Sequence, residues 1–112
     1  MKILLIHAKI NYDNMEPLGL LSLATTLKEH GHTVKVLDIF PEKNTYWLNI
    51  AEKFSADLVG YGFETPSYER IKEIHGILTR ILPNAIYCAG GIHPTVLPEE
   101  TLRELNLHFI VY

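Results

Sequence analysis

A pair of glycines followed by histidine and proline stands near the end of the chain, in the segment Tyr87-Cys-Ala-Gly-Gly-Ile-His-Pro-Thr95. Because glycine has no side chain, Gly90 and Gly91 let a ligand or a neighbouring backbone come close. His93 offers a nitrogen for a hydrogen bond or a metal, and the proline after it fixes the exit from the turn. A ligand slot and a plain tight turn both explain the two glycines, and the residues alone leave both open.

Other chemically capable residues have simpler explanations. Cys88 is the sole cysteine and lies in a predicted buried strand, which indicates an inert core thiol. His30 and His32 flank a glycine at a helix end and lack a third ligand for a metal. Glu99 and Glu100 follow a proline, where acidic side chains favour a helix start. We therefore predict no catalytic residue and no protein metal ligand.

The elements that must position the glycine pair can be predicted from apolar periodicity. Short runs such as Lys2-Ile-Leu-Leu-Ile-His7 are typical of strands buried on both faces. Leu18, Leu21 and Leu27 repeat at helical spacing, and Gly31 is placed to end that helix. We predict strands at 2–7, 33–38, 57–63, 85–89 and 107–112, and helices at 17–30, 45–54, 66–82 and 98–105.

Alternating strands and helices predict an α/β fold with a doubly wound, five-stranded parallel sheet, Rossmann-like or flavodoxin-like. We expect one domain over residues 1–112. In such sheets ligands bind beyond the carboxyl ends of the strands, where the strand order reverses. The loops at 8–16, 64–67 and 90–95 are therefore the candidate binding loops.

Composition narrows the function further. The chain has 112 residues, 47% of them hydrophobic, and a net charge of -3. This charge does not suit a nucleic-acid backbone, and no apolar run approaches the roughly 20 residues that span a bilayer. We expect a cytoplasmic protein with neither nucleic acid nor membrane as a partner.

Several common proteins of this fold lack support in the residues. A phosphoacceptor receiver needs acidic residues after the first strand and at the end of the third, but His7-Ala8 and Gly62-Phe63 stand there. A dinucleotide-binding domain needs Gly-x-Gly-x-x-Gly after the first strand, and that loop has no glycine before Gly19. The Asn-Tyr-Asp-Asn stretch at 11–14 is also unlike the phosphate loop of a flavodoxin.

The whole chain resembles the N-terminal cobalamin (B12)-binding domain of cobalamin-type radical S-adenosylmethionine (SAM) enzymes. The resemblance covers nearly all residues and depends on several segments in order. They are Glu16-Pro-Leu-Gly-Leu-Leu-Ser-Leu-Ala24, Glu29-His-Gly-His-Thr-Val-Lys-Val-Leu-Asp38, Asp57-Leu-Val-Gly60, Thr65-Pro-Ser-Tyr68 and Gly90-Gly-Ile-His-Pro-Thr-Val-Leu-Pro-Glu-Glu100.

The resemblance implies cobalamin as the cofactor, held over the carboxyl edge of the sheet. The loop after the first strand lacks the Asp-x-His-x-x-Gly motif of classical cobalamin domains, so no histidine ligand to cobalt is expected from it. The cofactor-binding residues that the resemblance implies are Lys9, Tyr12, Pro17, Leu18, Gly19, Thr65, Pro66, Ser67, Gly90, Gly91, Ile92, His93, Pro94 and Thr95.

The same resemblance implies a longer parent enzyme. Radical SAM chemistry needs Cys-x-x-x-Cys-x-x-Cys to hold a [4Fe-4S] cluster, and one cysteine cannot do so. We expect the cluster and SAM in a C-terminal radical SAM domain of the parent, which would transfer a methyl group or rearrange a substrate. This chain alone should catalyse nothing, and it is expected to self-associate through its last strand if that edge is exposed.

Two alternatives stay open from the residues. Half of a nucleotide-sugar glycosyltransferase shares the Met1-Lys-Ile-Leu-Leu-Ile6 start and the His30-Gly-His32 stretch. A degenerate domain kept only for packing would bind neither ligand. Binding of cobalamin separates both alternatives from the cofactor-binding module.

Overall fold

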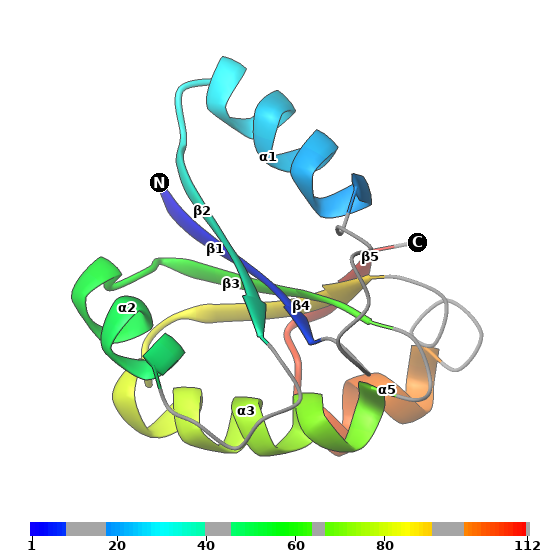
Figure 1. Ribbon diagram of the computed structural model, residues 1–112. Helices are drawn as coiled ribbons and strands as arrows, with labels where there is room; N and C mark the ends of the chain where they lie inside the picture. The colour runs from blue at the N-terminus through cyan, green and yellow to red at the C-terminus, as the bar shows by residue number, and fades with distance from the viewer. Residues whose placement is uncertain (9–17, 40–45, 64–66, 91–97, 112) are drawn as a thin grey trace.

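The computed structural model describes residues 1–8, 18–39, 46–63, 67–90 and 98–111 of the chain (Figure 1). Strands and helices alternate throughout, as the sequence predicted. In chain order the elements are β1 (Lys2–Ala8), α1 (Leu18–Glu29), β2 (Thr33–Ile39), α2 (Tyr46–Phe54), β3 (Leu58–Gly62), α3 (Tyr68–Ile81), β4 (Ile86–Gly90), α5 (Pro98–Leu105) and β5 (Phe109–Val111).

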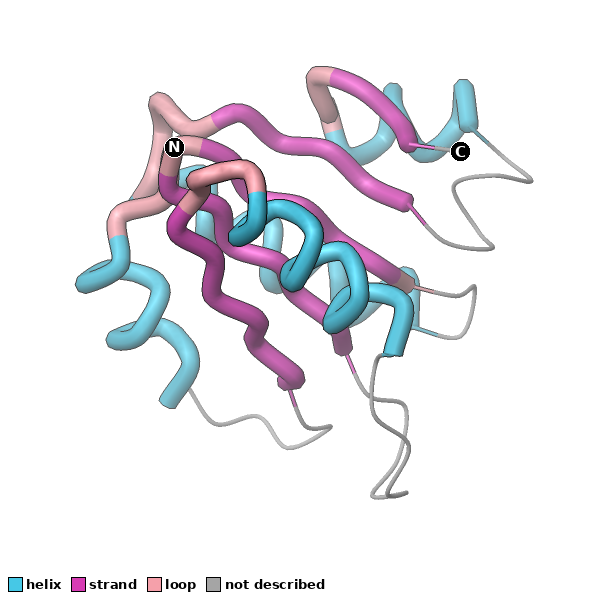
Figure 2. The backbone as a smooth tube through the Cα atoms, turned by 90° about the horizontal axis from the view of Figure 1, so that it is seen from above, coloured by secondary structure: helices cyan, strands magenta, loops and turns pink. Residues whose placement is uncertain are grey.

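The five strands form one parallel sheet in the order β2-β1-β3-β4-β5. The chain steps outward from β1 to β2 and then returns to the other side of β1 for the remaining strands. The strand order therefore reverses between β1 and β3, and all carboxyl ends lie along one edge of the sheet (Figure 2). This confirms the predicted doubly wound, flavodoxin-like fold and places its switch point.

The larger core lies between the sheet and the helices α2, α3 and α5, which share one face (Figure 1). The helix predicted at 66–82 is confirmed as α3, and its residues Ile71, Ile74 and Leu78 are fully buried in this core. Leu4 and Ile6 of β1 pack from the sheet into the same cluster. Burial on this face gives most of the hydrophobic stabilisation of the domain.

A smaller core lies on the opposite face, beneath α1. Ile3 and Leu5 of β1 meet Ala24 of α1 there. Gly62 of β3 has little room for a side chain, because a Cβ would lie 3.1 Å from the side chain of Leu20 of α1. The glycine therefore lets α1 pack closely against β3.

The ends of two helices follow local backbone chemistry. Gly31 has a φ of 90° and ends the turn after α1, as predicted. Asn106 has a φ of 54° and plays the same part after α5, where the Leu107 N–H donates to the Leu102 carbonyl. The predicted strand from 107 is therefore wrong at its start, because Leu107 belongs to the helix end and β5 begins at Phe109.

The face of β4 and β5 on the α1 side is partly uncovered. Ile86 is 38% exposed, Phe109 42% and Val111 50%. Among the described helices α1 alone lies on this face, while α2, α3 and α5 pack on the other (Figure 1). An apolar surface thus borders the edge strand β5, which we call the open face and define as Ile86, Phe109 and Val111.

Candidate functional site

The last row of residues at the carboxyl edge crosses all five strands. Register pairs Asp38 of β2 with His7 of β1, His7 with Gly62 of β3, Gly62 with Gly90 of β4, and Gly90 with Val111 of β5. We call this the edge row. It has a polar pair at one end, two glycines in the middle and an apolar side chain at the other end.

The polar end of the edge row is a histidine–carboxylate pair. Nδ1 of His7 lies 3.0 Å from Oδ1 of Asp38, and the two side chains are 29% and 25% exposed. The carbonyl of Asp38 also accepts a hydrogen bond from the Tyr46 hydroxyl at 3.1 Å. Sequence analysis did not select His7 or Asp38, although each stands near the end of a predicted strand, and this position is the signal that was available.

The two glycines in the middle of the edge row have packing reasons within the protein. Gly62 admits Leu20 of α1, as described above. At Gly90 a Cβ would lie 3.2 Å from the Val111 carbonyl oxygen, so the close approach of β5 requires a small residue there. The predicted contact of Gly90 with a cofactor stays a prediction, and β5 is one neighbour that already uses the space.

Ser67 links the start of α3 to the carboxyl end of β1. Its side chain is buried, and its hydroxyl donates to the Ala8 carbonyl at 3.0 Å. This bond joins the start of α3 to the end of β1. The direct cofactor contact predicted for Ser67 stays a prediction, and within this structure its hydroxyl bonds to the backbone of β1.

An aromatic pair follows at the start of α3. The rings of Phe63 and Tyr68 stack with centroids 5.6 Å apart, and the Tyr68 hydroxyl donates to Glu104 of α5 at 2.6 Å. Burial and this hydrogen bond raise the pKa of Tyr68. The same bond is the main reason that the pKa of Glu104 is lowered, with Lys72 adding to the effect. These contacts fix α5 against α3 beside the edge.

The remaining predicted contacts are distributed as follows. Leu18 begins α1. Gly19 in its first turn is exposed, and a Cβ atom added at Gly19 would meet no atom within 4 Å. Open space at Gly19 leaves room for a ligand, and its contact stays a prediction. Outside the described residues lie Lys9, Tyr12, Pro17, Thr65, Pro66, Gly91, Ile92, His93, Pro94 and Thr95.

Three residues with chemical potential are core residues. Cys88 is buried, and burial raises the pKa of its thiol to about 11. The burial of this thiol predicted from the sequence is thereby confirmed, and its low reactivity stays a prediction. Trp47 and Phe63 have aromatic rings that could flank a planar cofactor, but they are 1% and 2% exposed and belong to the larger core.

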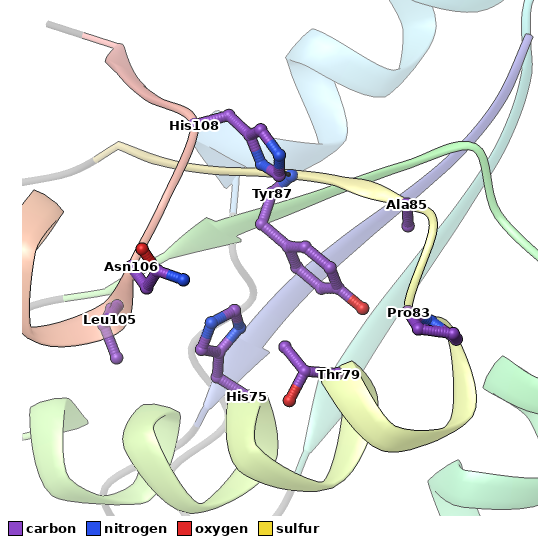
Figure 3. A pocket seen from close by; sticks show the side chains of 8 residues that line it. All are labelled: His75, Thr79, Pro83, Ala85, Tyr87, Leu105, Asn106 and His108. Atoms are coloured by element: carbon purple, nitrogen blue, oxygen red, sulfur yellow. Dashed lines mark hydrogen bonds between the residues drawn. The ribbon is translucent and has the colours of Figure 1, made fainter.

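A pocket of about 420 Å³ lies at the opposite edge, towards the amino ends of β4 and β5 (Figure 3). His75, Tyr87 and His108 form much of its wall. Their polar atoms are largely used within the protein: the Tyr61 hydroxyl donates to His75 Nδ1 at 2.8 Å, and His108 Nδ1 accepts the Tyr87 N–H at 3.0 Å. This pocket is far from the switch point, so the carboxyl edge is the candidate site.

Burial lowers the pKa of His75, and its hydrogen bond to the Leu105 carbonyl opposes that shift only in part. Burial therefore favours the neutral imidazole, whose Nδ1 lies 2.8 Å from the Tyr61 hydroxyl. Within the described ranges no three His, Cys, Asp or Glu side chains are grouped to hold a metal ion. None of the described helices has the length and apolar character to cross a membrane.

Comparison with known proteins adds a family match. The family described as B12 binding domain matches residues 3–112. An uncharacterized methyltransferase of Pyrococcus horikoshii is 36% identical over 90 residues, which make up 79% of this chain and 19% of that protein. An anaerobic magnesium-protoporphyrin IX monomethyl ester cyclase of Synechocystis is 31% identical over 114 residues, covering 95% of this chain and 22% of the cyclase.

Solved structures share the fold. A cobalamin-binding protein from Desulfitobacterium hafniense superposes with a TM-score of 0.75 at 15% identity, covering 98% of this chain and 52% of its own. The isolated REC domain of RcsB from Salmonella enterica gives 0.58 at 17% identity, covering 99% and 77%. At these identities the likeness establishes the architecture. The chain spans about a fifth of the length of the curated relatives it matches.

Proposed function

Because the chain belongs to the B12-binding domain family, we propose that it is a cobalamin-binding module that holds its cofactor over the carboxyl edge of the sheet. The observation that carries this proposal is the family match over residues 3–112. The fold supports it, since the strand order reverses between β1 and β3 and ligands of such sheets bind beyond that point.

The described residues at this edge suit a wide cofactor rimmed by amide groups. Gly62 and Gly90 bring no side chain to the middle of the edge row, and open space surrounds Gly19 at the start of α1. His7 and Asp38 add a partly exposed polar pair. A corrin ring that is bound through the amide groups at its rim needs a surface without protruding side chains and with hydrogen-bonding groups beside it.

The contacts proposed for this chain come from three loops and the first turn of α1. They involve the residues inferred from the resemblance, from Lys9 and Tyr12 in the first loop to Gly90–Thr95 in the last. Cobalamin supplies a cobalt centre for methyl transfer or rearrangement. The chain's own part is to bind and orient the cofactor, and Ser67 keeps two of the loops in register through its bond to Ala8.

The parent protein is proposed to be a cobalamin-type radical SAM enzyme. The matched relatives are more than four times as long as this chain, which supports a further domain in such proteins. That domain would hold the [4Fe-4S] cluster and SAM and would be the partner of this module. The name of one relative, a methyltransferase, favours methyl transfer as the parent's reaction.

Titration with hydroxocobalamin tests the proposal. We expect stoichiometric binding that survives gel filtration and is followed by the corrin absorbance. Gly91→Trp should abolish it by filling the proposed slot. Gly76→Trp is the matched control, because Gly76 is exposed on α3 and a Cβ atom added there would meet no atom within 4 Å.

The outcomes separate the alternatives. Binding lost in Gly91→Trp and kept in Gly76→Trp supports a cobalamin module with its slot at the double glycine. Binding that both variants keep would place the slot elsewhere. Absence of binding to the chain and to the full-length parent would leave a packing domain, and saturable binding of a nucleotide sugar instead would favour the glycosyltransferase alternative.

A further inference from the structure

The histidine–carboxylate pair of the edge row has no role in the packing of the core. His7 and Asp38 are direct neighbours in the register of β1 and β2, although 31 residues separate them in the chain. Both side chains are about a quarter exposed, at 25% and 29%. Packing alone would favour apolar residues at these places, as at Leu5 and Val36, which pair two positions earlier in the same strands and so lie on the same face of the sheet.

The pair also fixes the hydrogen position on the imidazole. An ionised carboxylate only accepts hydrogen bonds, so His7 Nδ1 carries the hydrogen that Asp38 Oδ1 accepts at 3.0 Å. In the neutral ring Nε2 is then left with its electron pair. Within the described part of the chain this atom has no hydrogen-bond partner, and it is not among the buried unpaired atoms.

We infer that His7, oriented by Asp38, is a cofactor-contacting residue whose Nε2 accepts a hydrogen bond from the bound corrinoid. The inference rests on the proposed function. A carboxylate that holds one ring nitrogen and so presents the other to a ligand is a common use of histidine in binding sites. His7 lies at the carboxyl edge, directly beside Gly62 in the edge row, where the cofactor is proposed to lie.

The corrinoid group that would contact His7 can be inferred from the acceptor atom, Nε2. Nε2 requires an N–H or O–H donor, and a cobalamin carries two kinds: the amide groups around the corrin ring and the ribose hydroxyl of the nucleotide tail. Cobinamide keeps the amides and lacks the tail. Comparing the two corrinoids therefore identifies the donor.

Three variants test the contact by titration with hydroxocobalamin. His7→Asn keeps a donor for Asp38 but removes the acceptor at the Nε2 position, and we expect about a fivefold rise in Kd, the usual effect of one hydrogen bond. His7→Gln places an amide oxygen near that position and should bind nearly as well as the natural chain. Asp38→Asn should weaken binding because the amide no longer holds the hydrogen on Nδ1.

The Asp38 effect should also depend on His7. The double variant His7→Asn with Asp38→Asn should bind no more weakly than His7→Asn, because Asp38 acts through the imidazole. A purely structural role would weaken binding in His7→Gln as much as in His7→Asn. Thermal unfolding of the four variants and the natural chain identifies any loss of folding.

Titration with cobinamide identifies the donor. If His7→Asn also weakens the binding of cobinamide, the donor is a corrin amide, and if it does not, the donor is the ribose hydroxyl.

Failure of the inference is distinguishable from failure of the proposed function. If the natural chain binds cobalamin and His7→Asn binds equally well, the function stands and the contact is refuted. Additive effects of the two substitutions would refute the orienting role of Asp38. If the natural chain and its full-length parent bind no corrinoid, the proposed function itself falls, and this inference with it.

Discussion

At the scale of single residues, burial divides the chemically capable side chains into core residues and one partly exposed pair at the sheet edge. Cys88 and His75 are buried among apolar neighbours, and burial disfavours their charged forms. His7 and Asp38 lie at the edge with partial exposure. Chemical capability therefore follows position in the fold, and residue type alone is a poor guide to it.

Stability should fall in mild acid because of His75. Its pKa in the folded state is below the ordinary 6.5, so unfolding takes up a proton once the pH is below that value. This contribution to stability is complete above about 6.5 and declines as the pH falls towards the lower folded-state pKa. Urea unfolding between pH 7 and pH 5 measures it, and His75→Gln should lose stability less steeply over this range.

His30→Gln is the control for that measurement, since His30 is exposed on the surface after α1. It should keep the pH dependence of the natural chain. An equal flattening in both variants would show that burial of His75 is not the cause.

The thiol of Cys88 should react slowly in the folded protein. Its raised pKa, about 11, leaves little thiolate at neutral pH, and 7% exposure limits access. Labelling with a thiol reagent should be slow in buffer and complete within the mixing time in denaturant. Rapid stoichiometric labelling of the folded chain would contradict the burial of this side chain.

At the scale of elements, small residues and single hydrogen bonds decide how the helices meet the sheet. α1 approaches β3 at Gly62, and the start of α3 is tied to the end of β1 through Ser67. Both contacts lie next to the carboxyl edge. The same features that pack the elements therefore lie beside the edge at which the cofactor is proposed to bind.

Adding a side chain at Gly62 should destabilise the domain. The Cβ in Gly62→Ala would lie 3.1 Å from the side chain of Leu20, so that side chain must move by a few tenths of an ångström, and we expect a cost of about 1–3 kcal/mol. Gly76→Ala is the matched control, because it meets no atom within 4 Å on a helix and should stabilise by up to about 1 kcal/mol. Chemical denaturation measures both, and equal effects of the two substitutions would refute the contact.

Removing the Ser67 hydroxyl should also reduce stability. Ser67→Ala leaves the Ala8 carbonyl without this donor at a buried position, which costs about 1–3 kcal/mol. Ser22→Ala on the exposed side of α1 is a suitable comparison and should change little. A neutral Ser67→Ala would show that the tie between β1 and α3 is dispensable.

At the scale of the whole molecule, the two faces of the sheet are covered unequally. α2, α3 and α5 share one face, and α1 lies on the other over β1 and its neighbours (Figure 1). The open face formed by Ile86, Phe109 and Val111 therefore adjoins the edge strand β5. Apolar surface beside an unpaired strand edge favours association.

The isolated chain should self-associate at high concentration through this surface. Phe109→Lys places a charge on the open face and should shift the protein towards monomer in gel filtration with light scattering. Leu102→Lys on α5, which is exposed on the other side of the sheet, should not. A natural chain that remains monomeric at millimolar concentration would contradict the prediction.

Much of the fold could be predicted from the sequence because it depends on neighbours in the chain. The apolar stripe with Ile71 and Ile74 predicted α3, and Gly31 predicted the end of α1. The start of β5 could not be placed this way. Asn106 and Leu107 complete the end of α5, but Leu107 is apolar and therefore resembles the first residue of a strand. Likewise the ordered motifs identified the family of the chain, and the family match over residues 3–112 confirmed it.

The sequence by itself determined the order of elements, the class of sheet and the kind of cofactor to test, because periodicity and motifs are local properties. Only the tertiary structure decided the strand order, the shared face of α5 with α2 and α3, and the meeting of His7 with Asp38. These depend on pairing between residues far apart in the chain, whose free energy comes from burial across the sheet. No pattern within one segment records which distant segment will be its neighbour.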